Sequence, residues 1–430
     1  MELHRQRMGA ILLFAALLAL LYVRAIAPAV SHVDTDFPNY LTAAKMVVDG
    51  GPTDRLYDDA WFQEEMRHYG VGNAEYGKFA PFPPPTALLL VPLAGLQPLA
   101  AVRVMTAFSL ICLVLSAVLL AKILGWRYVD AASFLLLSGY AVFNTLKFGQ
   151  PYIVVSLSCI LGYYAYLRNK PLLAGLCFGI FVPIKYVPVV FLLYFAFRRE
   201  WRVVLGGALA IAGVMLASLL VLGPQVHATF LSSVLGHHLI GQISMQSPFT
   251  ANFQSFDALS RRLFVFDPTG NPQPWLTLPW LQPVALAVTK CAIAAVALVT
   301  LQRLSRNGAS AVAPSIGLLG LLTLLLAPAT ATYHFTLLWL PVGLLIQHLA
   351  RARAPVCAVF LLCAYALIGF LPYGHTALFE GRGILSIIAF PRLWLLCAMF
   401  AASVRCLWTG ADLLPQYGTR PLAAEQSTRS

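Results

Sequence analysis

The chain has 430 residues, of which 59% are hydrophobic and 11% are charged. Together with a positive mean hydropathy, this composition excludes an ordinary soluble globular protein and indicates an integral membrane protein. The formal net charge of +12 does not indicate a surface that binds nucleic acid, because the basic residues fall in short clusters between apolar runs, as the positive-inside rule predicts.

The N-terminal region predicts an uncleaved first span that begins in the cytoplasm. Arg5 and Arg7 precede an apolar run over residues 9–30. A signal peptide is the alternative, since residues 25–30 are rich in small side chains, but the run is longer than the usual hydrophobic region of a signal peptide. We therefore expect the chain to reach the external face at about residue 31.

Residues 31–85 form the first long segment that does not span, and they hold more than half of the chain's 17 acidic residues. We expect this segment to be external. Residues 40–48 and 59–69 have the pattern of short amphipathic helices, separated by the breaker Gly50-Gly51-Pro52. The proline-rich run 79–85 predicts a rigid, extended return to the membrane.

A series of apolar runs follows, many of them long enough for a helix to cross about 30 Å of hydrocarbon. Residues 86–96 are too short to span and are expected in the interface. The run 172–197 has basic residues at both ends, so we expect a helical hairpin broken at Pro183–Pro188, with Lys185 at its external tip or partway down. The other expected spans are 99–124, 129–146, 152–167, 203–222, 281–302, 311–327, 335–350, 355–372 and 384–408.

These runs predict an all-α polytopic membrane protein with about eleven or twelve crossings. Residues 1–410 form one transmembrane domain of helical-bundle type, with a second external segment at 223–280 and a cytoplasmic, disordered tail at 411–430. The basic loops alone set this topology, yet it brings several isolated polar residues to the external side, namely Asp36, Gln150, Lys185, Asn252 and His334.

No metal or disulfide site is predicted. The eight cysteines lie in or beside apolar runs, without the spacing of a zinc site, and are read as small apolar residues. Adjacent residues such as His237 and His238 diverge on a helix, and no third ligand is near them in sequence. We expect neither a metal nor a cofactor.

Asp36 is the strongest catalytic candidate. An Asp beside a membrane is by default a helix N-cap or a solvated loop residue, and Asp34 fits that interpretation. Asp36 stands four residues before Tyr40, at the start of an expected amphipathic helix, where its carboxylate could project into a cavity beneath the loop. A carboxylate held at hydrogen-bond distance from a hydroxyl is a competent general base.

Lys185 is the second candidate, because an ionisable group at membrane depth costs about 3 kcal/mol unless it is paired. Its side chain either snorkels to the headgroups or holds a phosphate at the membrane surface. His334 is a lone histidine at the end of a span, for which a structural role is the alternative. Gln150 and Asn252 suit sugar hydroxyls, and equally suit the capping of helix ends.

The order of these motifs resembles glycosyltransferase family 87, from the first span to about Pro341. The motifs are Asp36 with Tyr40, Gly50 to Tyr57, Pro83-Pro84-Pro85, Phe148-Gly149-Gln150, Ala174-Gly175, Lys185 with Pro188, Ala327-Pro328 and Tyr333-His334-Phe335. Family members are GT-C-type enzymes related to the polyprenol-phosphate-mannose-dependent α-mannosyltransferases of actinobacterial lipoglycan synthesis.

The resemblance implies an inverting transfer of a sugar, with mannose as the expected sugar, from a polyprenyl-phosphate donor to a hydroxyl of a lipid or glycan acceptor. The reaction would occur on the external face of the bacterial inner membrane. Asp36 would be the general base, and Lys185 and His334 would contact the donor phosphate. Many members have a His-His pair where this chain has Tyr333-His334. Further candidates for substrate contact are Asp34, Tyr40, Gln150, Asn252, Gln254 and Tyr333.

A transporter or flippase of lipid-linked sugars is the alternative function, and a non-catalytic scaffold is a third. A transporter would also show many spans and broken helices. The sequence shows no internal repeat, and its polar residues lie toward one face instead of the midplane, which favours the enzyme. The discriminating expectation is that Asp36, Lys185 and His334 converge on one external cavity.

Overall fold

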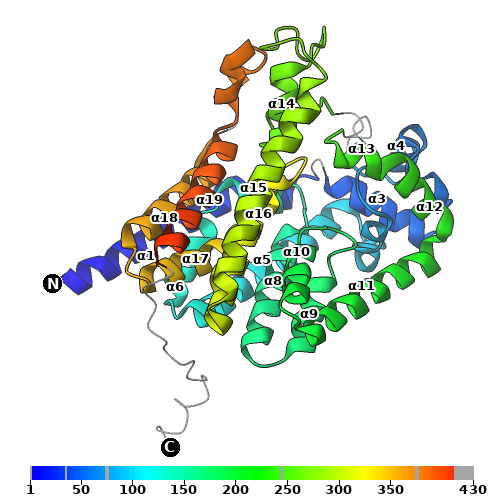
Figure 1. The fold of residues 1–430 in the computed structure, drawn as a ribbon. Coiled ribbons are helices and arrows are strands. Elements are labelled where there is room, and N and C mark those ends of the chain that lie inside the picture. The colour runs from blue at the N-terminus through cyan, green and yellow to red at the C-terminus, as the bar shows by residue number, and fades with distance from the viewer. Residues whose placement is uncertain (1, 34–35, 73–76, 243–245, 373–376, 411–430) are drawn as a thin grey trace, which may run out of the picture.

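The computed structural model describes residues 2–33, 36–72, 77–242, 246–372 and 377–410. Within these ranges the chain is helical, with one isolated bridge between Asp267 and Asn271, which confirms the predicted all-α architecture. The helices, drawn in Figure 1, are α1 (Glu2–Leu21), α2 (Ala27–Ser31), α3 (Phe37–Val48), α4 (Asp59–His68), α5 (Pro98–Leu124), α6 (Tyr128–Leu136), α7 (Tyr140–Lys147), α8 (Tyr152–Leu167), α9 (Pro171–Gly179), α10 (Val189–Phe197), α11 (Trp201–Leu222), α12 (Pro224–Thr229), α13 (Leu235–Leu239), α14 (Phe256–Phe264), α15 (Leu281–Ser305), α16 (Val312–Leu326), α17 (Trp339–Arg351), α18 (Pro355–Phe370) and α19 (Pro391–Gly410).

Six of the described helical segments are long and apolar enough to cross a membrane, and a seventh crossing is added if α6 and α7 count as one broken span. This number is smaller than the eleven or twelve crossings predicted from the apolar runs. The difference arises because several runs form shorter helices between breaks: α9 and α10 have nine residues each, and α17 has 13. The six segments are Arg7–Ser31, Pro98–Leu124, Trp201–Leu222, Leu281–Ser305, Gly308–Leu326 and Pro391–Thr409.

The segment between the first span and α5 contains both predicted amphipathic helices. α3 begins at Phe37, with Pro38 in its first turn, where proline fits because its ring presets a helical φ. α4 is separated from it by Gly50, whose positive φ of 70° ends the turn after α3. The predicted extended return is wrong in part, since residues 80–82 form turns and Pro84–Leu88 is a 3₁₀ helix.

α9 and α10 are separated by turns and bends over residues 180–188, which include the predicted break at Pro183–Pro188, and glycines hold α9 against α11. Gly175 and Gly179 of α9 face Gly206 and Gly207 of α11 so closely that a Cβ on Gly175 would overlap the carbonyl oxygen of Val203. Small residues permit this backbone approach, which is the usual way that helices pack tightly in a membrane. Because Lys185 lies in the turns between α9 and α10, this contact sets the position of its backbone.

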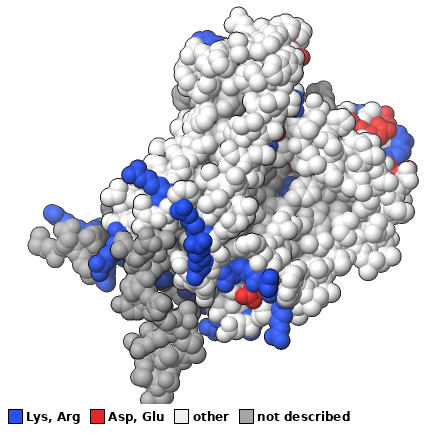
Figure 2. Space-filling view, in the orientation of Figure 1, with Lys and Arg blue, Asp and Glu red and all other residues white. Residues whose placement is uncertain are grey.

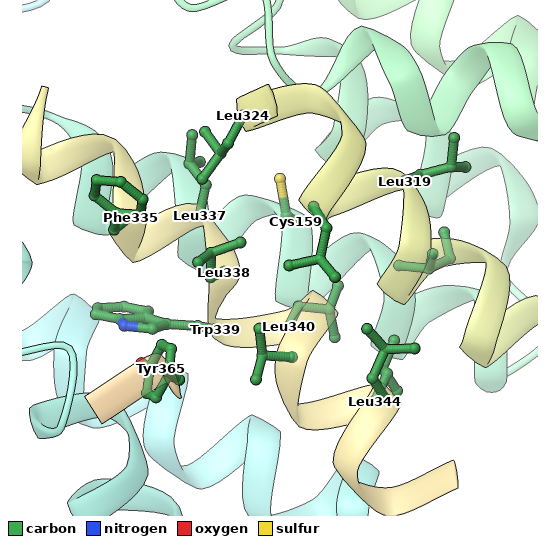
Figure 3. Packing of buried hydrophobic residues seen from close by; sticks show 14 of the residues in the cluster. Cys159, Leu319, Leu324, Phe335, Leu337, Leu338, Trp339, Leu340, Leu344 and Tyr365 are labelled. Atoms are coloured by element: carbon green, nitrogen blue, oxygen red, sulfur yellow. The ribbon is translucent and has the colours of Figure 1, made fainter. Parts of the chain in front are cut away.

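The buried core lies where α16 and α17 meet α8 and α18, as Figure 3 shows. Phe335, Leu338 and Trp339 each expose 1% or less of their surface. The Trp339 indole N–H donates a 3.2 Å hydrogen bond to Ser138, which lies in the break between α6 and α7, where the two helices are bent by 75°. The 3₁₀ helix Thr332–Leu338, which carries His334, is therefore fixed from its C-terminal side by the core.

The segment between α11 and α15 contains α12, a π-helical turn over Phe230–Val234, α13 and α14. α14 is tied to α15 by an ion pair of 2.5 Å between Asp257 and Lys290. Arg262 of α14 is buried and bonds the Glu380 carboxylate at 2.7 Å. The first ion pair holds α14 against the top of α15 in the view of Figure 1, and the second ties α14 to the segment that precedes α19.

The charges of the described residues are unevenly distributed. Figure 2 shows most of the visible Lys and Arg along the lower edge of the molecule, with others at the top and beside α4, while Asp and Glu are visible mainly beside α4 at the upper right. Lys122, Arg168, Arg198 and Arg303 all lie at or just after the C-terminal ends of helices. The same view shows a hollow beside α15 in which atoms of Lys or Arg are visible.

We predict that Gly175→Leu destabilises the packing of α9 on α11. The added side chain has no space against the α11 backbone, and forcing atoms into a packed contact costs about 1–3 kcal/mol or more. The thermal unfolding temperature of the purified protein in detergent should fall by several degrees.

The matched control is Gly213→Leu on the exposed side of α11, where no atom lies within 4 Å of a built Cβ. It should leave the unfolding temperature close to that of the wild type. Equal unfolding temperatures for the two variants would contradict the glycine contact.

Candidate active site

Asp36 occupies the N-cap position of α3. Its side chain accepts no capping hydrogen bond from the main-chain N–H groups of this helix, all of which lie in the described residues. Its main-chain carbonyl accepts hydrogen bonds from the N–H groups of Asn39 at 3.1 Å and Tyr40 at 3.4 Å. The half-buried carboxylate instead accepts a 2.7 Å hydrogen bond from Nε2 of Gln150. The contact across 114 residues shows that this carboxylate points toward the start of α8.

Gln150 reaches Asp36 because Gly149 lets the two segments approach. Gly149 has a positive φ of 61°, and a Cβ there would lie 2.6 Å from the Phe37 ring. Any side chain at this position would therefore be strained and would push α3 away from α8. Gln150 itself is 1% exposed, so its amide is a fixed part of the wall of the site.

A chain of hydrogen bonds connects Lys185 to Asp36. Lys185 Nζ donates to the Tyr40 hydroxyl at 3.3 Å, and that hydroxyl donates to Oε1 of Gln150 at 2.8 Å. Gln150 then donates from Nε2 to Asp36. Every bond points the same way, from the cation to the carboxylate. Burial and the charge of Asp36 raise the pKa of Tyr40 well above its ordinary value, so its hydroxyl remains a donor.

Lys185 is surrounded by aromatic rings. Its Nζ lies 4.8 Å from the ring centroid of Phe82, 4.9 Å from that of Tyr152 and 5.8 Å from that of Tyr40. Such cation–π contacts stabilise an ammonium that has lost part of its water. Burial lowers the pKa of Lys185 to about 8, against the opposing effect of Asp36. The side chain still keeps accessible surface, being half-buried, so a ligand can reach it.

His334 lies beside one of these rings, that of Tyr152. Its imidazole is 4.7 Å from the Tyr152 ring and 4.9 Å from the Tyr333 ring, both centroid to centroid. Nδ1 accepts a 2.8 Å hydrogen bond from the N–H of Ala331, which assigns the remaining proton to Nε2. Burial, then the charges of Lys185 and His238, lower the pKa of His334 to about 3. His334 is therefore a neutral donor through Nε2.

Three residues of this region were missed in the sequence. Phe82 lies in the proline-rich run, Tyr152 begins an apolar helix, and His238 was considered only as a metal ligand. In the structure Tyr152 stacks on Tyr333 with centroids 5.2 Å apart. The pKa of His238 is lowered to about 4 by burial and by Lys185. Aromatic residues next to Pro81 and Pro151 were the available signal, since proline fixes the local backbone.

The remaining predicted contacts lie elsewhere or outside the described residues. Asn252 is exposed. Gln254 is 2% exposed, and its amide bonds main-chain groups, donating to Ala251 and Ala389 and accepting from Arg392. It therefore joins loops instead of facing a cavity. Asp34 lies outside the described residues.

The arrangement combines a carboxylate that can take a proton with a cation and a neutral imidazole that can stabilise negative charge. Lys185 acts on the pKa of His334, and Asp36 acts on the pKa of Lys185, so the three groups share one electrostatic environment. A base next to an anion-binding site suits attack by a hydroxyl with departure of an anionic group.

Comparison with protein families identifies the family of the chain. The sequence model of glycosyltransferase family 87 matches residues 79–328, a range that contains Gln150 and Lys185, begins after Asp36 and ends before His334. Comparisons with curated proteins and with solved structures found no match. Because the matched range is more than half of the 430 residues, the chain belongs to glycosyltransferase family 87 and is a multi-pass membrane glycosyltransferase of the GT-C superfamily.

Proposed function

We propose that the protein transfers a sugar from a polyprenyl-phosphate donor to a hydroxyl of a lipid or glycan acceptor, with Asp36 as general base. The observation that carries the proposal is the hydrogen-bond chain from Lys185 through Tyr40 and Gln150 to Asp36. It holds a carboxylate and a cation at a fixed separation in one site. Mannose is the sugar that the family resemblance favours.

The cationic side of the site supports a phosphate-linked donor. Lys185 is a charged donor in a low-dielectric environment, where a charge-assisted hydrogen bond to phosphate is strong. His334 adds a neutral donor, and His238 Nδ1 is buried without a hydrogen-bond partner among the described residues. The hollow beside α15 in Figure 2 supports access from the bilayer, which a polyprenyl tail requires.

The reaction is a single displacement. The acceptor oxygen attacks the anomeric carbon of the sugar, and the bond between that carbon and the phosphate oxygen breaks. The acceptor proton passes to Asp36, while the bonding electron pair stays on the lipid phosphate beside Lys185 and His334. A lipid phosphate is a stable anion, so no general acid is needed. One displacement inverts the anomeric configuration.

The location of the reaction follows from the charge distribution. The basic helix ends lie along the lower edge of Figure 2, and α3, which carries Asp36 at its start, lies toward the acidic end. By the positive-inside rule the basic edge is cytoplasmic. We therefore place both termini in the cytoplasm and the reaction on the periplasmic face of the inner membrane.

Asp36→Asn should abolish most of the transfer without affecting donor binding. An amide cannot accept the acceptor proton, and loss of a positioned general base lowers kcat by about 10²–10⁴. The measurement is transfer from a radiolabelled polyprenyl-phosphate sugar to membrane acceptors, using purified protein in lipid nanodiscs.

Asp54→Asn is the matched control, because Asp54 is an exposed carboxylate in the same segment. It should retain wild-type turnover. If Asp36→Asn and the wild type turned over equally, Asp36 would not be the base.

The pH dependence of transfer should report Lys185. Its pKa is lowered to about 8, so the ammonium is present below that pH and is lost as the pH rises through it. Turnover of the wild type should therefore decline above about pH 8. Lys185→Arg keeps its charge at high pH, so its normalised profile should remain level there.

The Lys185→Met variant has no charge at this position, so its turnover in sugar transfer should be low at every pH between 6 and about 9. A wild-type profile that stayed flat to pH 10, or an identical decline in Lys185→Arg, would exclude Lys185 as the titrating group.

A further inference from the structure

A cavity opens next to the Asp36 site, between α4, the turn before Phe82 and the segment from α12 to α13. Its volume is about 530 Å³, within the range of small-molecule sites. Ala80 and Pro81 line it, and the next residue, Phe82, presents its ring to Lys185 and Tyr40. One residue therefore joins the cavity to the reaction centre.

Phe82 is held in this position from the cavity side. The hydroxyl of Tyr57, a lining residue, donates a 2.7 Å hydrogen bond to the main-chain carbonyl of Phe82. The Tyr57 ring also packs against Phe79 and Phe230, with centroids 5.5 and 5.9 Å away. Its apolar face is thus rigidly placed at the cavity wall.

The lining combines apolar side chains with polar ones and includes no Lys or Arg among the described residues. The described residues that line the cavity include hydroxyl, imidazole, amide and carboxylate groups, from Thr229, Ser233, His237, Gln242 and Asp59, and none is Lys or Arg. His237 Nδ1 is 2.9 Å from the Ser233 carbonyl, which can only accept, so in neutral His237 Nε2 is an acceptor. The lining offers several uncharged donors and acceptors and one carboxylate.

We propose that this cavity binds the glycan of the acceptor, a neutral carbohydrate with several free hydroxyls. The inference rests on the proposed function and names the acceptor class for it. Sugar hydroxyls need alternating donors and acceptors, and the apolar face of a sugar ring packs on a rigid aromatic ring such as Tyr57. A phosphate-bearing ligand would need a cation, and Lys185 supplies one at the Asp36 site instead.

The backbone of the segment from α12 to α13, which forms one side of the cavity, supports this placement. α12 and α13 are joined by a π-helical turn over Phe230–Val234, and such turns insert one extra residue and are frequent at binding sites. Ser233 and Val234 of this turn line the cavity, while Ser232 does not. With the glycan seated here, its terminal sugar reaches Asp36 by passing Phe82.

Ser233→Phe tests the proposal, and Ser232→Phe is the matched control. Both serines are exposed residues of the same π-helical turn, so both variants place the same ring in the same backbone, but only the first fills the cavity. The probes are soluble mannose, glucose and galactose di- and trisaccharide glycosides, with saturation-transfer NMR on the full chain in nanodiscs as the binding measurement.

We expect at least one glycoside to bind the wild type and Ser232→Phe, and none to bind Ser233→Phe. The KM for a glycan acceptor should rise about tenfold or more in Ser233→Phe with little change in kcat, which indicates loss of ground-state binding. Hydrolysis of the donor by water should stay within about twofold, because the donor side is untouched.

Two results overturn the proposal: wild-type binding by Ser233→Phe, or no binding of any glycoside by the wild type. A different result separates the two proposals. If the wild type neither transfers nor hydrolyses polyprenyl-phosphate donors but Ser233→Phe still loses glycoside binding, the glycan cavity is supported and the proposed donor is wrong.

Discussion

Burial of the Lys185 ammonium is the constraint on which the site depends. Removing a charge from water into a protein interior costs several kcal/mol unless it is compensated. Here the compensation comes from three aromatic rings and from Asp36, which acts through Tyr40 and Gln150. A direct ion pair would occupy both charged groups. Two neutral residues connect the charges through hydrogen bonds and leave each end able to engage a substrate.

Three close contacts hold the site in place, and each comes from a different part of the fold. The glycines of α9 and α11 fix the hairpin that carries Lys185. The packing of Phe37 on Gly149 fixes Asp36 relative to Gln150. The core around Trp339 fixes the turn that carries His334. None of these contacts touches a substrate, yet each sets a distance within the site.

Part of the fold and of the site could be predicted from local sequence patterns. The amphipathic period and the Gly50 breaker predicted α3 and α4. The positions of the basic loops predicted that Asp36 and Lys185 lie on the same side. The bend of 75° between α6 and α7 could not be predicted, since an apolar run looks the same whether straight or broken. Gln254 was read as a sugar ligand because sequence shows that an amide is present, but not that main-chain groups use it.

The contact between Phe37 and Gly149 has a consequence for how such an enzyme can change during evolution. α3 is anchored to α8 at its first residue, whereas α4 and the turn before Phe82 follow later in the chain. Insertions or deletions in the connection after α3 would alter the surface around Tyr57 and Asp59 without moving Asp36. Under the proposed function, acceptor preference can therefore diverge while the chemistry of transfer stays the same.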